Sequence, residues 1–390
     1  MSADQDGTEE PSAAADAGLA RLGRRVRRLR IALAGTALVA LVCALAVAAV
    51  LVYWHLYLLE PKGTPFTRGP FITRLSSSGA AFAWTLDRSA TVDLRALSPD
   101  GSEVTASAGR FGALQPATRY SWTAAIAGRT RAAGTFTTAP VDLRTPIRFA
   151  VIGDYGAGND HEWAVGRVLA AQQPDFILTA GDNSYLVALP ALLDRNIFDP
   201  LHDAMANAPL WATLGEHDLF LDGGKAIIAA LHLPGDGKHY SVRYGPIQIV
   251  ALGLQADAAG LSYARRALAE QGPSVRFILV HRPIRAGNPI LPLLRARHVA
   301  AILAGPLHRY ERQVVSGVLE FTAGTSGEGP GDPGHTRPSP HAAISLLNYG
   351  LLRIDVASGG IAYSFVDEQG HVLDRHRGAL SPCRATTPCP

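Results

Sequence analysis

The chain of 390 residues has no cluster of basic residues beyond its N-terminal thirty positions. Its formal net charge is only +3, and residues 1–30 contribute +1 of that, from six arginines and five acidic residues. A protein that binds the phosphate backbone of a nucleic acid needs a concentrated basic surface. We therefore expect no nucleic-acid partner.

Cysteine is also scarce, with three residues in the whole chain. Cys43 lies within an apolar run and is interpreted as a small hydrophobic residue. Cys383 and Cys389 flank five residues near the C-terminal end. In an oxidising compartment this pair could close a small disulfide loop, and two free thiols in a tail are an equally good interpretation.

Charged residues are absent from one long stretch, residues 31–54. About 20 apolar residues suffice to cross a bilayer as a helix, so this stretch is predicted to be a transmembrane helix. Arginines crowd its N-terminal side, and positive charge favours the cytoplasmic side of a membrane. We therefore predict a single-pass protein of the cell membrane, in which residues 1–30 form a disordered, basic-ended cytoplasmic tail and the rest lies outside.

A cleaved signal peptide is the alternative interpretation of this region. It would be of the twin-arginine kind, given Arg24 and Arg25, and residues 46–48 could serve a signal peptidase. The apolar segment of a signal peptide is typically about 7–15 residues long, and this run is longer. The retained anchor is the favoured prediction.

Residues 64–140 show short stretches in which apolar and polar residues alternate, such as that of Tyr120, Trp122 and Ala124, with turn sequences between them. Such a pattern predicts a small β-sandwich. Leu114 and Tyr120 bracket a proline-containing turn, which resembles the corner of fibronectin type III domains, where the tyrosine hydroxyl holds the corner. We interpret this domain as a support and not as a catalyst.

Residues 146–375 have a different texture, in which apolar runs alternate with helical or loop segments, and residues 376–390 are interpreted as a C-terminal tail. Continuous apolar strands are buried on both faces, as in α/β folds. A long segment rich in glycine, proline and serine, 324–345, is predicted to be a loop that borders a site. The runs are 147–152, 175–180, 209–214, 247–252, 276–280 and 299–304.

Potential metal ligands directly follow five of these runs. In open α/β sheets, ligands bind at the carboxyl ends of the strands, so these side chains should meet at one edge. A single aspartate after a strand is usually a cap or turn residue, but agreement among five strand ends is much less expected by chance. The candidates are Asp154, Asp182, Tyr185, Glu216, His217, His281 and His308.

The order GD-x-G, GD-x-x-Y, G-x-H-D, H-x-P and G-x-x-H-x-YER resembles the purple acid phosphatase branch of the calcineurin-like metallophosphoesterases. The resemblance covers about residues 64–375, including the fibronectin-like part. It implies that an all-β sandwich and then an α/β metallophosphoesterase domain, built as a four-layer α/β/β/α sandwich, follow the predicted membrane anchor helix. It also implies one or two metal ions as cofactors.

The resemblance implies that the first metal, usually ferric iron, is held by Asp154, Asp182, Tyr185 and His308. Oxygen donors with one imidazole suit such a cation. The second metal, often zinc, manganese or iron, would share Asp182 and bind His281.

Two positions of the second site depart from the family pattern. Glu216 stands at the asparagine position and Pro306 at that of a histidine. Proline has no side-chain donor, so one ligand is lost, whereas Glu216 can bind a metal but adds a negative charge. Three protein ligands with water still form a viable site for a divalent ion.

In the family, two metal ions hold the phosphate and activate a hydroxide for in-line attack on the ester. His217 matches the histidine beside the phosphate, which protonates the leaving group or stabilises the transition state. The expected function is therefore that of a membrane-anchored, extracytoplasmic phosphoesterase acting on phosphate esters. Glu216 and Pro306 motivate the alternative, a catalytically impaired pseudo-phosphatase with a binding or structural role. No motif identifies the substrate-binding residues.

Overall fold

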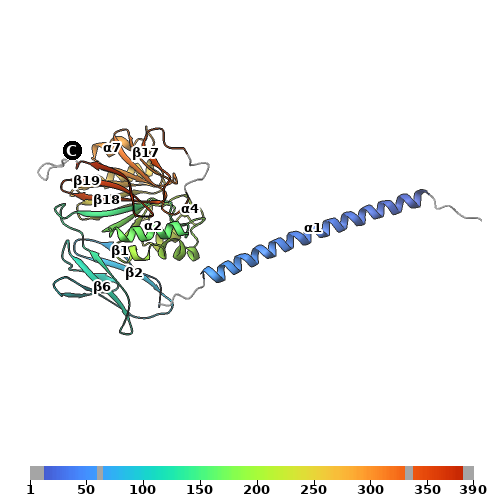
Figure 1. Cartoon of the computed structure of the whole chain (residues 1–390), viewed down its shortest axis with the longest axis horizontal. Helices are drawn as coiled ribbons and strands as arrows, with labels where there is room; N and C mark the ends of the chain where they lie inside the picture. The colour runs from blue at the N-terminus through green and yellow to red at the C-terminus, as the bar shows by residue number, and fades with distance from the viewer. Residues whose placement is uncertain (1–12, 59–64, 330–336, 381–390) are drawn as a thin grey trace, which may run out of the picture. The chain divides into compact units, whose positions relative to one another are not determined.

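The computed structural model of the chain describes residues 13–58, 65–329 and 337–380 (Figure 1). The chain divides into two units, Met1–Pro61 and Lys62–Pro390. Cys383 and Cys389, for which the sequence leaves a disulfide and two free thiols open, lie outside the described residues.

The first unit contains one long helix, α1 (Ala13–Leu58). Its segment Arg24–Leu51 is long and apolar enough to cross a membrane by length and composition, with a hydropathy of 2.6. Side chains such as Leu29, Leu38 and Leu45 are more than half exposed. Residues 13–30 are helical, so the expected disorder is wrong for them; alanine, leucine and arginine are strong helix formers, which accounts for the extension.

The second unit begins with two antiparallel sheets that pack face to face. Phe82 contacts Trp122 at a ring distance of 5.1 Å and Phe136 at 6.0 Å, which joins the two sheets in one core. The backbone N–H of Gln115 donates to the Tyr120 hydroxyl at 2.9 Å, so this hydroxyl holds the turn between Leu114 and Tyr120. The sheets have the orders β1-β2-β5 and β4-β3-β6-β7, with β1 (Phe66–Leu75), β2 (Ala80–Leu86), β3 (Val92–Leu97), β4 (Glu103–Thr105), β5 (Arg110–Phe111), β6 (Arg119–Ile126) and β7 (Arg129–Thr137).

The remainder contains two larger mixed sheets, and all six predicted apolar strands are present. The first sheet has the order β10-β9-β8-β18-β19-β20 and the second β11-β12-β13-β14-β16-β15-β17. The strands of the first are β8 (Ile147–Ile152), β9 (Phe176–Thr179), β10 (Leu210–Ala212), β18 (Gly350–Ala357), β19 (Gly360–Asp367) and β20 (Val372–Gly378). Those of the second are β11 (His239–Tyr244), β12 (Ile247–Leu252), β13 (Val275–Leu279), β14 (Ala301–Ala304), β15 (Tyr310–Val315), β16 (Val318–Ala323) and β17 (Ala342–Leu346).

These sheets form the inner two of four layers. Phe149 of β8 packs against Phe277 of β13 with ring centroids 5.2 Å apart, whereas the neighbouring Ala150 and Ile152 belong to a separate core with α2 (Asp160–Ala171). The outer face of the second sheet forms a third core with α6 (Ala258–Ala267) and α7 (Leu291–Ala296). Alternating side chains therefore face both layers, which produces the α/β/β/α arrangement.

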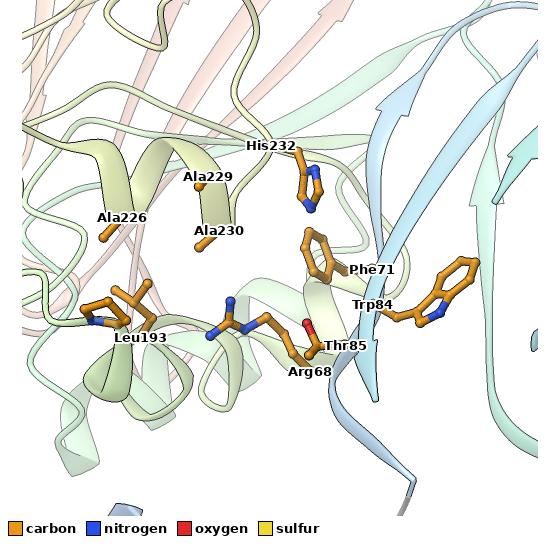
Figure 2. A pocket seen from close by; sticks show the side chains of 10 residues that line it. Arg68, Phe71, Trp84, Thr85, Leu193, Ala226, Ala229, Ala230 and His232 are labelled. Atoms are coloured by element: carbon orange, nitrogen blue, oxygen red, sulfur yellow. The ribbon is translucent and has the colours of Figure 1, made fainter. Parts of the chain in front are cut away.

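Several short elements connect β9 to β11 and contact the two sheets of the sandwich formed by β1 to β7. Arg68 of β1 donates from Nε to Asp194 Oδ1 at 2.8 Å and lies 4.2 Å from the centre of the Phe198 ring. Beside this pair, a cavity of about 320 Å³ is lined by Arg68, Trp84, Ala226 and His232, among others (Figure 2). These elements are η1 (Pro190–Leu192), η2 (Asp194–Phe198), α3 (His202–Met205), α4 (Glu216–Leu219) and α5 (Lys225–Ala230).

Candidate metal centre

Three buried side chains meet at the carboxyl ends of β8, β9 and β13. Asp154, Asp182 and His281 each offer a ligand atom, and these atoms all lie within 4.8 Å of one another. His281 Nε2 is 3.5 Å from Asp182 Oδ2. β8 and β9 are neighbouring parallel strands of the first mixed sheet, whereas β13 belongs to the second. The cluster therefore lies at carboxyl ends of strands, as expected, but it joins two sheets and not one edge of a single sheet.

Close backbone approach around this cluster requires glycine. Gly181, which precedes Asp182, has φ +96°, and a Cβ there would collide with the His281 ring. A Cβ on Gly215 would collide with the Asp182 carboxylate. The glycines of the sequence motifs therefore let three strand ends come together around the two aspartates.

Tyr185 and His308 complete the first predicted ligand set. The Tyr185 hydroxyl donates to Asp182 Oδ2 at 3.2 Å and lies 3.4 Å from His308 Nε2. His308 Nε2 is also 3.8 Å from Asp154 Oδ2. All four side chains predicted for the first metal thus converge.

The chemistry of Asp154 fits a cation at this position. Its carboxylate is fully buried, and within the described parts of the chain neither of its oxygens has a hydrogen bond of normal length and angle. The nearby backbone N–H of His308 gives it only partial compensation. Burial, followed by the charge of Asp182, raises the pKa of Asp154 well above its usual range, although His281 opposes this. A buried carboxylate is costly without a partner, and a bound cation would reverse this shift.

Tyr185 shows the same tendency. Burial, with the nearby charges of Asp154 and Asp182, raises the pKa of its phenol. A phenolate ligand therefore requires a cation beside it, because a metal ion reverses the local effect of the carboxylates.

The side chains of the second predicted ligand set also lie close together, but Glu216 is already paired with an arginine. Glu216 Oε2 lies 2.6 Å from His281 Nε2, and Arg282 Nε donates to Glu216 Oε1 at 2.5 Å. Although burial alone raises it, hydrogen bonds from His281 and Arg282 lower the pKa of Glu216 to about 2. Pro306, which follows β14, adds no donor. The structure thus supplies three donors here, and one of them is paired with an arginine.

His281 is oriented by its other ring nitrogen. Nδ1 lies 2.6 Å from the carbonyl oxygen of Ala180, which can only accept, so Nδ1 carries the proton and Nε2 faces the carboxylates. Burial lowers the pKa of His281, but the carboxylates of Asp182 and Glu216 outweigh it and leave the pKa well above its usual range.

His217 lies beside the cluster at the start of α4. Its backbone N–H donates to Asp182 Oδ1 at 2.9 Å, and its ring packs 4.3 Å from that of Tyr185. Nδ1 is 2.7 Å from the carbonyl oxygen of Leu186. Because that oxygen accepts, Nδ1 is protonated and Nε2 is the atom available for proton transfer.

Some neighbours of the cluster have structural roles. Asp218 accepts hydrogen bonds from the backbone N–H groups of Gly215 and Asn183, at 2.9 Å each, and so holds two ligand-bearing turns. Arg312 pairs with Asp374 at 2.9 Å, and buried Glu311 accepts from Ser345. The glutamate and arginine of the YER sequence are therefore structural.

Three contacts near the cluster were not found from the sequence. Asn183 donates from Nδ2 to Asp218 Oδ2 at 2.7 Å and to the Thr213 carbonyl at 2.9 Å, and only its position after Asp182 could have suggested this. The Arg282–Glu216 pair joins residues 66 positions apart. No local pattern predicts such a pair.

Comparisons with solved structures identify the architecture. The purple acid phosphatase PPD1 from yellow lupin (Lupinus luteus) seeds is similar to this chain with a TM-score of 0.67 and 14% identity, over 81% of this chain and 75% of that one. The fold is that of the calcineurin-like metallophosphoesterases. PhoD matches this metallophosphoesterase fold with a TM-score of 0.57 and 10% identity, over 84% of this chain and 94% of its own. No protein-family model and no curated protein sequence matches the chain.

Proposed function

We propose that this chain is a metal-dependent phosphoesterase that hydrolyses phosphate esters. The observation that carries the proposal is the fully buried, unsatisfied Asp154 carboxylate beside Asp182 and His281. Asp154, Asp182, Tyr185 and His308 would hold the first metal, for which iron is the best candidate. Asp182, His281 and Glu216 would hold a second ion, namely zinc, manganese or iron.

Residues of the chain would supply the proton transfer and hold the ligands in position. A bound metal would polarise the phosphate and lower the pKa of the attacking water. In its doubly protonated form, His217 would give the Nε2 proton to the leaving oxygen and keep the Nδ1 proton on the Leu186 carbonyl, which fixes its ring. Asp218 and Asn183 would keep the turns that carry Asp182 and Glu216 in place.

We also propose the placement of the parts. Helix α1 would anchor the chain in the cell membrane with the catalytic domain, residues 146–375, outside. Residues 64–140 would form a fibronectin type III-like support. The 28 apolar-rich residues of Arg24–Leu51 support the anchor.

A catalytically impaired protein with a binding role is the second candidate. Arg282 neutralises Glu216, and Pro306 lacks a donor, so the second position has fewer free ligands than the first. In that case the first metal would be structural.

The test is phosphate release by the full chain in detergent, with iron, zinc or manganese supplied, across pH. The matched control is Asp154→Ala, together with metal analysis of both proteins. Metal-dependent turnover that disappears in the control would support the phosphoesterase. A folded, metal-loaded chain that hydrolyses neither monoesters nor diesters would overturn it in favour of the binding role.

A further inference from the structure

A large groove opens beside the candidate metal centre. Glu216, Arg282 and Pro306 form its inner end, and it extends over a volume of about 1130 Å³ towards Val314 and His341. Pockets for drug-sized ligands measure about 300–1,000 Å³. The groove therefore has room for an organic group far larger than a phosphate.

One wall of the groove is held rigidly. The backbone N–H of Ile284 donates to Glu320 Oε2 at 2.8 Å, and Asn288 Nδ2 donates to the Ala256 carbonyl at 3.0 Å. The backbone N–H of Arg282 donates to the Leu254 carbonyl at 2.8 Å. A wall fixed in advance loses little conformational entropy when a ligand binds, which favours affinity.

Among the lining residues that the structure describes, the groove combines apolar surface with an exposed arginine, Arg285. Leu307 and Val314 line it, and Val314 is 60% exposed. Both acidic residues that line the described part of the groove already have partners. Glu216 pairs with Arg282, and Asp257 caps α6 by accepting from the Gly260 N–H at 2.9 Å. Within the described lining, the exposed Arg285 therefore adds a positive charge that neither Glu216 nor Asp257 neutralises.

We propose that this groove binds the organic group of the substrate, and that the substrate is an extended phosphate ester with a second anionic group, which Arg285 binds. This inference rests on the proposed phosphoesterase function. An apolar ring or chain would lie against Leu307 and Val314, with the reacting phosphate at the inner end and the second anion at the guanidinium.

Calorimetric titration of the full chain in detergent micelles tests the groove directly. The probes are inorganic phosphate, adenosine 5′-monophosphate and adenosine 3′,5′-bisphosphate, which separate the contributions of size and charge. We expect the bisphosphate to bind about tenfold more tightly than the monophosphate, the scale of one charge-assisted contact. Arg285→Ala should bring the ratio of the two Kd values close to one, and Arg285→Lys should restore part of it.

Two further variants make the test specific. Val314→Glu should weaken bisphosphate binding more than phosphate binding, because it adds a negative charge to the groove. Arg265→Ala removes an exposed arginine of α6 that does not line the groove, and should leave the Kd ratio unchanged. A wild-type ratio near one, or an equal loss for both nucleotides in Arg285→Ala, would overturn the inference.

The outcomes also separate this inference from the proposed function. Hydrolysis of 4-nitrophenyl phosphate without discrimination between the two nucleotides would keep the phosphoesterase and refute the groove. Discrimination between the nucleotides without hydrolysis of any ester would refute the catalytic proposal and keep the groove as a ligand site.

Discussion

At the scale of single residues, this chain keeps several carboxylates in places where water cannot solvate them. Asp154, Glu162 and Glu320 are each at most 1% exposed. Burial penalises the charged form and raises the pKa of each acid. Each raised pKa should therefore make the folded chain less stable as the pH rises. Asp154 alone of the three is a candidate metal ligand, so its contribution to stability should also depend on metal.

Asp154→Asn tests the cation requirement without relying on catalysis. In chelator-treated protein we expect the variant to be more stable than the parent by about 1–3 kcal/mol, because an unpaired buried carboxyl is removed. With metal supplied, the order should reverse, because only the parent retains the full ligand set. Thermal denaturation with and without metal measures both states; the same order in both would contradict the metal site.

Glu320 should make stability depend on pH. Burial raises its pKa to about 7, although the Ile284 N–H and Gln313 oppose the shift. The folded pKa lies above the unfolded value of about 4.3, so the stabilisation is fully present below about pH 4.3 and is lost as pH rises through 7. The loss amounts to about 3 kcal/mol at high pH.

The variant Glu320→Gln isolates this group. The variant should lack that part of the pH dependence. The free energy of unfolding of the variant, relative to that of the parent, should therefore be higher at pH 8 than at pH 5. Denaturant titrations at the two pH values measure the difference, and a difference that does not change with pH would exclude Glu320 as its source.

At the scale of elements, the metal cluster depends on tight turns after β9 and before α4. The glycine before Asp182 is needed twice, for its positive φ and for its contact with the His281 ring. Only glycine fits at position 181 without strain, because any side chain at this position would displace the ring of His281, a candidate ligand.

Gly181→Ala should lower both stability and metal affinity. Gly101 provides the matched control, since it has a similar φ of +86° but lies in open space. We expect Gly101→Ala to cost about 1–2 kcal/mol from backbone strain alone, and Gly181→Ala to cost clearly more and to lower metal content. Equal costs, with full metal content in both variants, would show that the close contact is unimportant.

Much of this arrangement could be predicted from the sequence, because local signals dominate it. Continuous apolar runs predicted β8, β9, β10, β12, β13 and β14, and the residues after them predicted the cluster, since topology brings parallel strand ends together. The Arg282–Glu216 pair and the wall held by Glu320 depend on side chains from distant strands. No periodicity or motif encodes such contacts, so only the folded chain reveals them.

At the scale of the whole molecule, the described side chains of α1 form no packed core. Its leucines are exposed along the segment Arg24–Leu51. Such a surface is costly in water and is satisfied in a bilayer.

The full chain should therefore remain with the membrane fraction after washing at high salt and at alkaline pH. A chain that starts at residue 65 should be released, because the apolar helix is gone. Immunoblots of the two fractions measure this. Recovery of a shorter, released form from cells that express the full chain would instead support a cleaved signal peptide.

The contact between β1 and η2 connects the sandwich formed by β1 to β7 to the segment that carries Tyr185. Arg68 pairs with Asp194, and two residues later Asn196 donates from Nδ2 to the Tyr185 carbonyl at 2.7 Å. Trp122 adds a second attachment by donating to the Ala206 carbonyl at 2.9 Å. A force on the sandwich would thus be transmitted to Tyr185, a candidate iron ligand, through two hydrogen bonds and the covalent chain between them. Movement of the sandwich would therefore disturb the candidate metal centre.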